Sequence, residues 1–233
     1  MLEKCSEDSE RILQYTRRED QLLALASSLM IKRICRNAQV IRKDATGRGI
    51  KPCCSNGPMF NVSHDEEFAV CMHAIGFSVG IDIMKVQVSQ GNNGSLEKMF
   101  DTLTPIFSHA EWAFILDDKP LDRFYYLWTA KEAYVKCIGT GLYTEPQDLE
   151  TFDYCMTENH VEMKIRHANV PACNFSITVY TAMIPGYVVG ICTGPIAECD
   201  PSWTRFVQPC TNTQAPHCNF SPSHVVLTVD DLL

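Results

Sequence analysis

The sequence predicts an α+β protein in which each half places helices before antiparallel strands. Residues 7–36 carry an apolar stripe at helical spacing, with a break near 17–20. In the second half, a helical pattern begins at Pro120 and ends at Gly139 or Gly141. Strand-like segments follow at 150–154, 161–166, 174–181 and 187–192. Runs of helices followed by runs of strands indicate an α+β fold, here with a possible pseudo-repeat.

Shorter segments fill the first half between its helix and its strands. Residues 44–58 hold three glycines and two prolines and are predicted to form a loop. Residues 60–62 are a short strand candidate, and 63–65 are predicted to turn. The apolar segments 67–75 and 77–84 are predicted to pair as a hairpin.

A Gly- and Asn-rich connection at 87–95 marks the predicted boundary between two lobes. We therefore divide the chain into an N-terminal lobe, 1–90, and a C-terminal lobe, 91–194. The rest, 195–233, is rich in polar residues, Pro and Cys and is predicted to be a surface tail. Its final apolar segment, 225–229, is expected to return as an edge strand.

Charge and composition exclude some classes of function. The apolar fraction of 45% and the charged fraction of 21% are those of an ordinary globular protein. The net charge of −8 divides into +4 for residues 1–52 (11 Lys and Arg, 7 Asp and Glu) and −12 for the remainder (9 and 21). Nucleic acid is therefore not an expected partner. The basic start could hold a phosphorylated small molecule or be a solvated helix face.

The expected location is the cytosol. The first residues are charged and lack the apolar core of a signal peptide. The apolar tract 68–84 contains His73, Gly76 and Asp82, so it is interpreted as two buried strands and not as a membrane span. The 12 cysteines show no metal-binding spacing, and we expect reduced thiols.

Asp82 is an isolated carboxylate in the apolar run Val-Gly-Ile-Asp-Ile. Burying a carboxylate without a partner is costly, so the pattern predicts a salt bridge, a backbone cap or a cation ligand. Gly80, two residues earlier, would let a ligand or another backbone approach closely.

A second group of polar residues lies on one helix. Trp128, Glu132 and Lys136 fall at i, i+4 and i+8, so they share a face. Glu132 with Lys136 is also the ordinary pair that stabilises any helix, and such a Trp is often core. Combined with Asp82, the row suits a metal-bound, negatively charged ligand.

The motif FNVSH, 60–64, places an amide, a hydroxyl and an imidazole close together at the end of a strand. Such a segment can present backbone N–H groups and polar side chains to a phosphate. The ordinary alternative is an Asx or Ser/Thr turn beside a surface histidine.

The ordered combination of FNVSHDEEFAV, GID and WTAKEAYVK resembles the Sfp-type 4′-phosphopantetheinyl transferases. Three further segments, GIDIMK, SLMIKRI and IGTGL, are most similar to an animal subgroup of that family. The resemblance is clear over residues 7–155 and weaker to 193. It implies two pseudo-repeated α/β lobes, each with helices packed on a mainly antiparallel sheet. Since family members usually have a further N-terminal strand, we expect lobe 1–90 to lack it.

The resemblance also implies a reaction. Coenzyme A binds between the lobes with Mg²⁺ on its pyrophosphate, a serine of an apo carrier protein attacks the β-phosphorus, and 3′,5′-ADP leaves. By position, Asp82 and Glu132 are the expected metal ligands, with Glu132 also the expected base. Lys136 is expected to contact phosphate, and Lys131 to contact coenzyme A. Mg²⁺ and Mn²⁺ both take oxygen ligands, so the sequence leaves the choice between these two metals open.

The same resemblance assigns residues to the nucleotide end of coenzyme A. These are Arg11, the loop cations Arg48 and Lys51, and the motif residues Asn61, Val62, Ser63 and His64. Many relatives have a glutamate two residues after the GID aspartate, where this chain has Met84. We therefore expect a water to complete the metal shell.

The implied partners are apo acyl carrier protein and related carrier domains, including the aminoadipate reductase type. We expect a monomer that binds no membrane, with the carrier docking near residues 99–107. Two alternatives stay open: a coenzyme A or carrier-binding protein of the same fold without turnover, and an unrelated metal phosphohydrolase.

Overall fold

The computed structural model describes residues 8–36, 40–43, 49–54, 57–88 and 95–204. Arg48 and the predicted terminal strand at 225–229 lie outside these residues. The helices are α1 (Ser9–Leu13), α2 (Arg18–Cys35), α3 (Leu96–Leu103), α4 (His109–Asp117), α5 (Pro120–Ile138) and α6 (Pro201–Thr204). Within the described part, no helix is long and apolar enough to cross a membrane.

The strands are antiparallel wherever they pair. In chain order they are β1 (Val40–Lys43), β2 (Gly49–Cys54), β3 (Met59–Asp65), β4 (Phe68–Ala74), β5 (Ser78–Lys85), β6 (Leu149–Met156), β7 (His160–His167), β8 (Val170–Pro171), β9 (Ser176–Ile184) and β10 (Tyr187–Gly194). A six-stranded sheet has the order β5-β10-β9-β7-β6, with β8 on β7, while β1-β2 and β3-β4 form separate pairs. The predicted mixed α+β class with antiparallel sheets is confirmed.

Several predicted elements are confirmed from local signals. Helix α5 begins at Pro120 and ends before Gly139, which adopts the left-handed conformation at φ 81°. Helix α4 likewise begins at a local signal, a capping box formed by Ser108 and Glu111. The break in the first helix falls between α1 and α2.

Three predictions in the first half are wrong. The expected turn at 63–65 is part of β3, and the chain turns instead at Glu66, with φ 48°. The second wrong prediction is the hairpin of segments 67–75 and 77–84. These segments become β4 and β5, which do not pair with each other: β4 pairs with β3, and β5 pairs with β10 along its whole length. A strand with six consecutive buried residues needs a covered place in a larger sheet. The third, the loop 44–58, contains strand β2.

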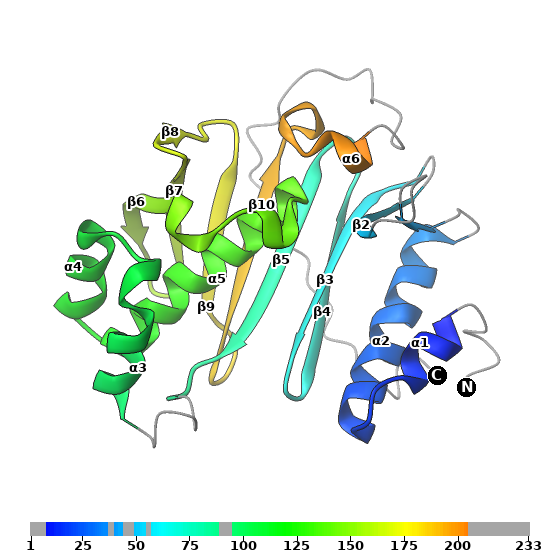
Figure 1. The fold of residues 1–233 in the computed structure, drawn as a ribbon, viewed down its shortest axis with the longest axis horizontal. Helices are drawn as coiled ribbons and strands as arrows, with labels where there is room; N and C mark the ends of the chain where they lie inside the picture. The colour runs from blue at the N-terminus through cyan, green and yellow to red at the C-terminus, as the bar shows by residue number, and fades with distance from the viewer. Residues whose placement is uncertain (1–7, 37–39, 44–48, 55–56, 89–94, 205–233) are drawn as a thin grey trace.

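Helix α5 lies across the six-stranded sheet and makes the main core with it (Figure 1). Its inward residues Leu127, Ala130, Ala133 and Cys137 are fully buried. The β3–β4 pair lies between β5 and α2 (Figure 1). Because β5 and β10 belong to the two predicted lobes, one sheet joins them.

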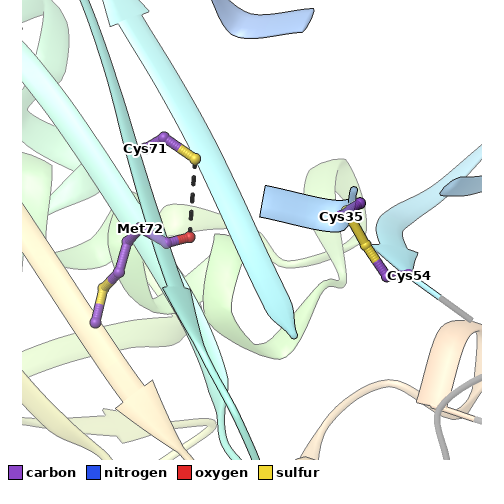
Figure 2. Close-up of a disulfide and its surroundings, with 4 residues drawn as sticks. All are labelled: Cys35, Cys54, Cys71 and Met72. Carbon is purple, nitrogen blue, oxygen red and sulfur yellow. Dashed lines mark hydrogen bonds between the residues drawn. A yellow bond between two sulfur atoms is a disulfide. The ribbon is translucent and has the colours of Figure 1, made fainter. Parts of the chain in front are cut away.

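Cys35 of α2 and Cys54 of β2 form a disulfide, as Figure 2 shows. This corrects the expectation that the cysteines are all reduced thiols. Cys54 lies in β2, which the sequence analysis assigned to a loop. The spacing of the cysteines along the chain therefore gave no indication that Cys54 lies beside Cys35. Among the described cysteines, the other seven are free thiols.

Candidate functional site: a carboxylate pair on β5 and α5

Asp82 lies in the buried strand β5 and is 4% exposed. Its Oδ1 accepts hydrogen bonds from Ser63 Oγ at 2.9 Å and from Lys136 Nζ at 2.5 Å. Its Oδ2 is buried and has no hydrogen-bond partner. Burial raises the pKa of Asp82, and Lys136 opposes that shift. The carboxylate therefore has one satisfied oxygen and one with unused capacity to bind a cation or a donor.

Glu132 lies one turn before Lys136 on α5 and is partly buried. Burial raises the pKa of Glu132, and the charge of Asp82 raises it further. The two carboxylates are therefore close enough to repel each other. In the part of the chain that the structure describes, no donor hydrogen-bonds to Glu132.

Trp128, the third residue of the predicted row, packs against the core. Its ring stacks on Phe124, with 5.9 Å between the centroids. Packing of this kind is the ordinary alternative for a tryptophan on this face.

Glycine brings α5 close to β5 beside Asp82. A Cβ on Gly80 would collide with the backbone of Ala133 and Cys137, and one on Gly190 would lie 2.7 Å from the carbonyl oxygen of Thr129. Of the two alternatives for Gly80, close approach of another backbone is the one observed. The close approach sets the distance between the strand of Asp82 and the helix of Glu132 and Lys136.

The donor set fits a hard divalent cation. Two carboxylates, one with an unsatisfied buried oxygen, provide the oxygen ligands that Mg²⁺ or Mn²⁺ prefers. Among the described residues, no group of three or more His, Cys, Asp or Glu side chains forms a fuller metal site. Met84 on β5 offers only a thioether, so a bound cation would need water or ligand oxygens for its remaining positions.

A separate basic pocket of about 180 Å³ lies between the first helices and β3. Its lining residues include Arg11, Arg42, Asn61, Val62 and His64. Arg11 donates to Ser28 Oγ at 2.9 Å. Asp8 lies 3.4 Å from Arg11 and 3.5 Å from Arg42, so one carboxylate holds both guanidinium groups.

Strand β3 connects the pocket to the carboxylate pair. Asn61, Val62 and His64 line the pocket, while Ser63 donates to Asp82. The Asn61 Oδ1 also accepts from the backbone N–H of Ile81 in β5, at 2.8 Å. The FNVSH segment therefore contacts both places, as a strand and not as a turn.

Comparison with known proteins connects this geometry to a family. The family model described as the 4′-phosphopantetheinyl transferase superfamily matches residues 78–192. That range contains Asp82, Glu132 and Lys136. Over these residues, just under half of its length, the chain is similar to the 4′-phosphopantetheinyl transferase superfamily.

Curated proteins of the superfamily match a longer part of the chain. The human L-aminoadipate-semialdehyde dehydrogenase-phosphopantetheinyl transferase is 34% identical over 159 residues, which are 62% of this chain and 51% of that protein. A phosphopantetheinyl transferase of Thraustochytrium sp. is 31% identical over 154 residues, 58% of this chain and 52% of that protein. The chain spans about half the length of the curated relatives it matches.

Solved structures match less well. An ACPS–CoA complex of Chronobacterium ammoniagenes is 15% identical, with a TM-score of 0.37 over 51% of this chain and 96% of that one.

Two lysines assigned to coenzyme A by the superfamily resemblance are engaged elsewhere. Lys131 is 3% exposed, and its ammonium pairs with the fully buried Glu111 at 3.0 Å. Lys51 is 7% exposed and donates to the backbone of β5 and α5. Amines enclosed in this way cannot extend to a ligand without leaving these partners.

The predicted carrier-docking stretch is also corrected in part. Met99 and Phe107 are 2% and 6% exposed and belong to the main core. Their apolar character is explained by packing, so these two side chains are not available to a partner protein.

Arg42 is a pocket residue that the sequence reasoning missed. Burial lowers the pKa of Arg42, and Asp8 opposes the shift. The sequence shows that Arg42 belongs to the basic first 52 residues. It does not show that Arg42 and Arg11 share the carboxylate of Asp8, because that depends on how β1 lies against α1.

Proposed function

We propose that this protein transfers 4′-phosphopantetheine from coenzyme A to a serine of apo carrier proteins and releases 3′,5′-ADP. The observation that supports this most directly is the unsatisfied Asp82 Oδ2 beside Glu132 and Lys136. All three belong to the range matched by the transferase superfamily. The named relatives are themselves phosphopantetheinyl transferases.

In the proposed site, Asp82 and Glu132 would hold Mg²⁺ or Mn²⁺. When bound, such a cation neutralises negative charge on the pyrophosphate. Ser63 and Lys136 hold Asp82 Oδ1 in place, which leaves Oδ2 directed away from them. Lys136, with 28% of its side chain exposed, can also contact a phosphate oxygen and stabilise charge as it develops.

The proton of the carrier serine would pass to the Glu132 carboxylate, directly or through water. The serine oxygen forms a bond to the β-phosphorus, and the bond from that phosphorus to 3′,5′-ADP breaks. Glu132 is partly buried and lies near Asp82, so its carboxylate would be near the reacting phosphate and could accept this proton.

The basic pocket would take the other end of coenzyme A. Arg11 and Arg42 supply positive charge there, and His64 and Asn61 supply polar groups for the 3′-phosphate and adenosine. In this proposal the two ends belong to a cleft between two pseudo-repeated lobes, 1–90 and 91–194. The remaining parts of the proposal are a monomeric enzyme of the cytosol and carrier domains of fatty-acid synthesis and aminoadipate reductase type.

The test is transfer to a carrier. The chain is incubated with coenzyme A, Mg²⁺ and an apo acyl carrier protein, and the carrier is weighed by intact mass spectrometry. We expect a mass increase of one phosphopantetheine, abolished by Asp82→Ala and by Glu132→Ala. Coenzyme A binding without a mass change would instead support a binding protein, and release of plain phosphate or nucleotide would support a hydrolase. Near-normal transfer by either variant would refute the metal assignment.

A further inference from the structure

We propose that Lys51 is a positioning residue that clamps β5 to the end of α5 and so fixes Lys136 relative to Asp82. The inference rests on the proposed transferase function. It replaces the expectation that this lysine binds a phosphate of coenzyme A.

The Lys51 ammonium lies where both catalytic elements meet. It donates to the backbone carbonyl of Val79 in β5 at 2.5 Å and to that of Lys136 in α5 at 2.6 Å. The Cys137 carbonyl at 3.0 Å and Ser78 Oγ at 3.2 Å are also within hydrogen-bond distance, so four oxygens share the three N–H groups of the ammonium. One amine therefore links the strand of Asp82 to the turn of α5 that carries Lys136.

The carbonyls that Lys51 binds need a donor. The last four carbonyls of a helix have no intrahelical partner, and those of Lys136 and Cys137 belong to the last turn of α5. The C-terminal end of a helix is also its negative end, which favours a cation. Ser78, fully buried, donates to the Cys137 carbonyl at 2.5 Å and completes the network.

Burial argues against a second role for this amine as a ligand for phosphate. Lys51 is 7% exposed, and burial lowers its pKa. The four acceptors named above are neutral oxygens, three of them backbone carbonyls. Moving the ammonium to a phosphate would leave these buried carbonyls without their donor.

The clamp acts on the backbone of Lys136, not on its amine. A small displacement of the last turn of α5 would move Lys136 Nζ away from Asp82 Oδ1 and from Ser63 Oγ, where it now lies at 2.5 Å and 2.8 Å. Groups that support a site from behind in this way alter rates by roughly tenfold to a hundredfold when removed. We therefore expect the turnover number to respond and coenzyme A affinity not to respond.

The test compares Lys51→Met, Lys51→Arg and the exposed control Lys98→Met. Each is assayed for kcat, for KM and for the Kd of coenzyme A by calorimetry. The clamp predicts that Lys51→Met and Lys51→Arg lower kcat by roughly tenfold or more with an unchanged Kd. A phosphate ligand predicts the opposite: Lys51→Met weakens binding, while Lys51→Arg, which also binds phosphate, keeps both affinity and rate. That pattern, or unchanged kcat in a folded Lys51→Met, overturns the proposal.

Hydrogen exchange provides a readout that does not need turnover. In Lys51→Met, or in Lys51→Arg if the first variant does not fold, amides at the end of α5 and in β5 should exchange faster than in Lys98→Met. Equal exchange would refute the clamp. If the natural chain transfers nothing to a carrier, the proposed function fails, and the exchange result still decides the role of Lys51.

Discussion

Replacing Lys131 with methionine tests whether this superfamily lysine supports the fold or binds coenzyme A. Its ammonium is enclosed between α4 and α5, where it pairs with Glu111 Oε2 at 3.0 Å and donates to the carbonyl of Ile106 at 3.0 Å. Burial lowers the pKa of Lys131, and the Glu111 charge opposes that shift. Methionine keeps the length of the side chain and removes the charge.

The expected loss of stability follows from what remains behind. Glu111 is fully buried, and its oxygens accept from Ser108 N at 2.8 Å, Thr151 N at 2.8 Å and Thr151 Oγ1 at 2.7 Å. Without Lys131 this carboxylate keeps its donors but has no cation beside it. Removing one partner of a buried pair costs about 3–5 kcal/mol. That is a large part of the roughly 5–15 kcal/mol by which a domain is stable.

The measurement is urea unfolding, with the same substitution at an exposed pair as control. Lys164 pairs with Asp153, and the two side chains are 61% and 59% exposed. We expect Lys164→Met to lower the unfolding free energy by less than about 1 kcal/mol. Adding Glu111→Gln to Lys131→Met should restore part of the loss, because the unpaired charge is then removed.

Two results would refute this reasoning. One is a folded Lys131→Met protein that loses less than about 1 kcal/mol of stability. The other is a raised KM for coenzyme A with stability unchanged. The first would show that the pair with Glu111 contributes little to stability, and the second that Lys131 acts on the ligand.

Three further predictions concern packing, thiols and the carboxylate pair. Gly80→Ala should destabilise the protein by about 1–3 kcal/mol or more and lower the rate of transfer, because a Cβ there collides with the backbone of α5. The control is Gly49→Ala, where a Cβ meets open space, and it should leave thermal unfolding unchanged. Under native conditions at pH 8, iodoacetamide should label the exposed Cys155 well before Cys71, because burial raises the pKa of Cys71 to about 12. Peptide mapping gives the order of labelling, and equal labelling rates would contradict this prediction. Mg²⁺ at ten times its Kd should stabilise the natural chain by about 1.4 kcal/mol, seen as a Tm rise of roughly 3–6 °C that Glu132→Gln abolishes; an equal rise in that variant would exclude Glu132 as a ligand.

Local signals were enough to predict helix α5 and strand β5, which carry the carboxylate pair. The bounds of α5 follow from Pro120 and Gly139, which act on the neighbouring backbone alone. The pairing of β5 could not be predicted in this way. Its partner β10 lies at the other end of the described chain, and an apolar run is equally compatible with either neighbour.

The two enclosed lysines show a second limit of sequence reasoning. Lys51 and Lys131 stand next to motifs in which positive charge suggests phosphate binding. Whether an amine reaches a ligand depends on which carbonyls and carboxylates the fold brings to it. The partner of Lys131 is Glu111, and the partners of Lys51 include carbonyls at the end of α5. Both sets of partners are far from their lysine in the sequence. Only the tertiary arrangement distinguishes a ligand contact from a structural one.

The arrangement around Asp82 has an energetic consequence for the proposed site. Strand β5 pairs with β10 on one edge, and a side chain of β3 hydrogen-bonds to its backbone on the other. Helix α5 covers the strand so closely that a Cβ at Gly80 has no space. A carboxylate in such a rigid position cannot turn Oδ2 toward a donor. An unsatisfied buried polar atom costs about 1–3 kcal/mol and more when charged, so the rest of the core must offset it. A bound cation would remove that cost, which is why its binding should be detectable as stability even without turnover.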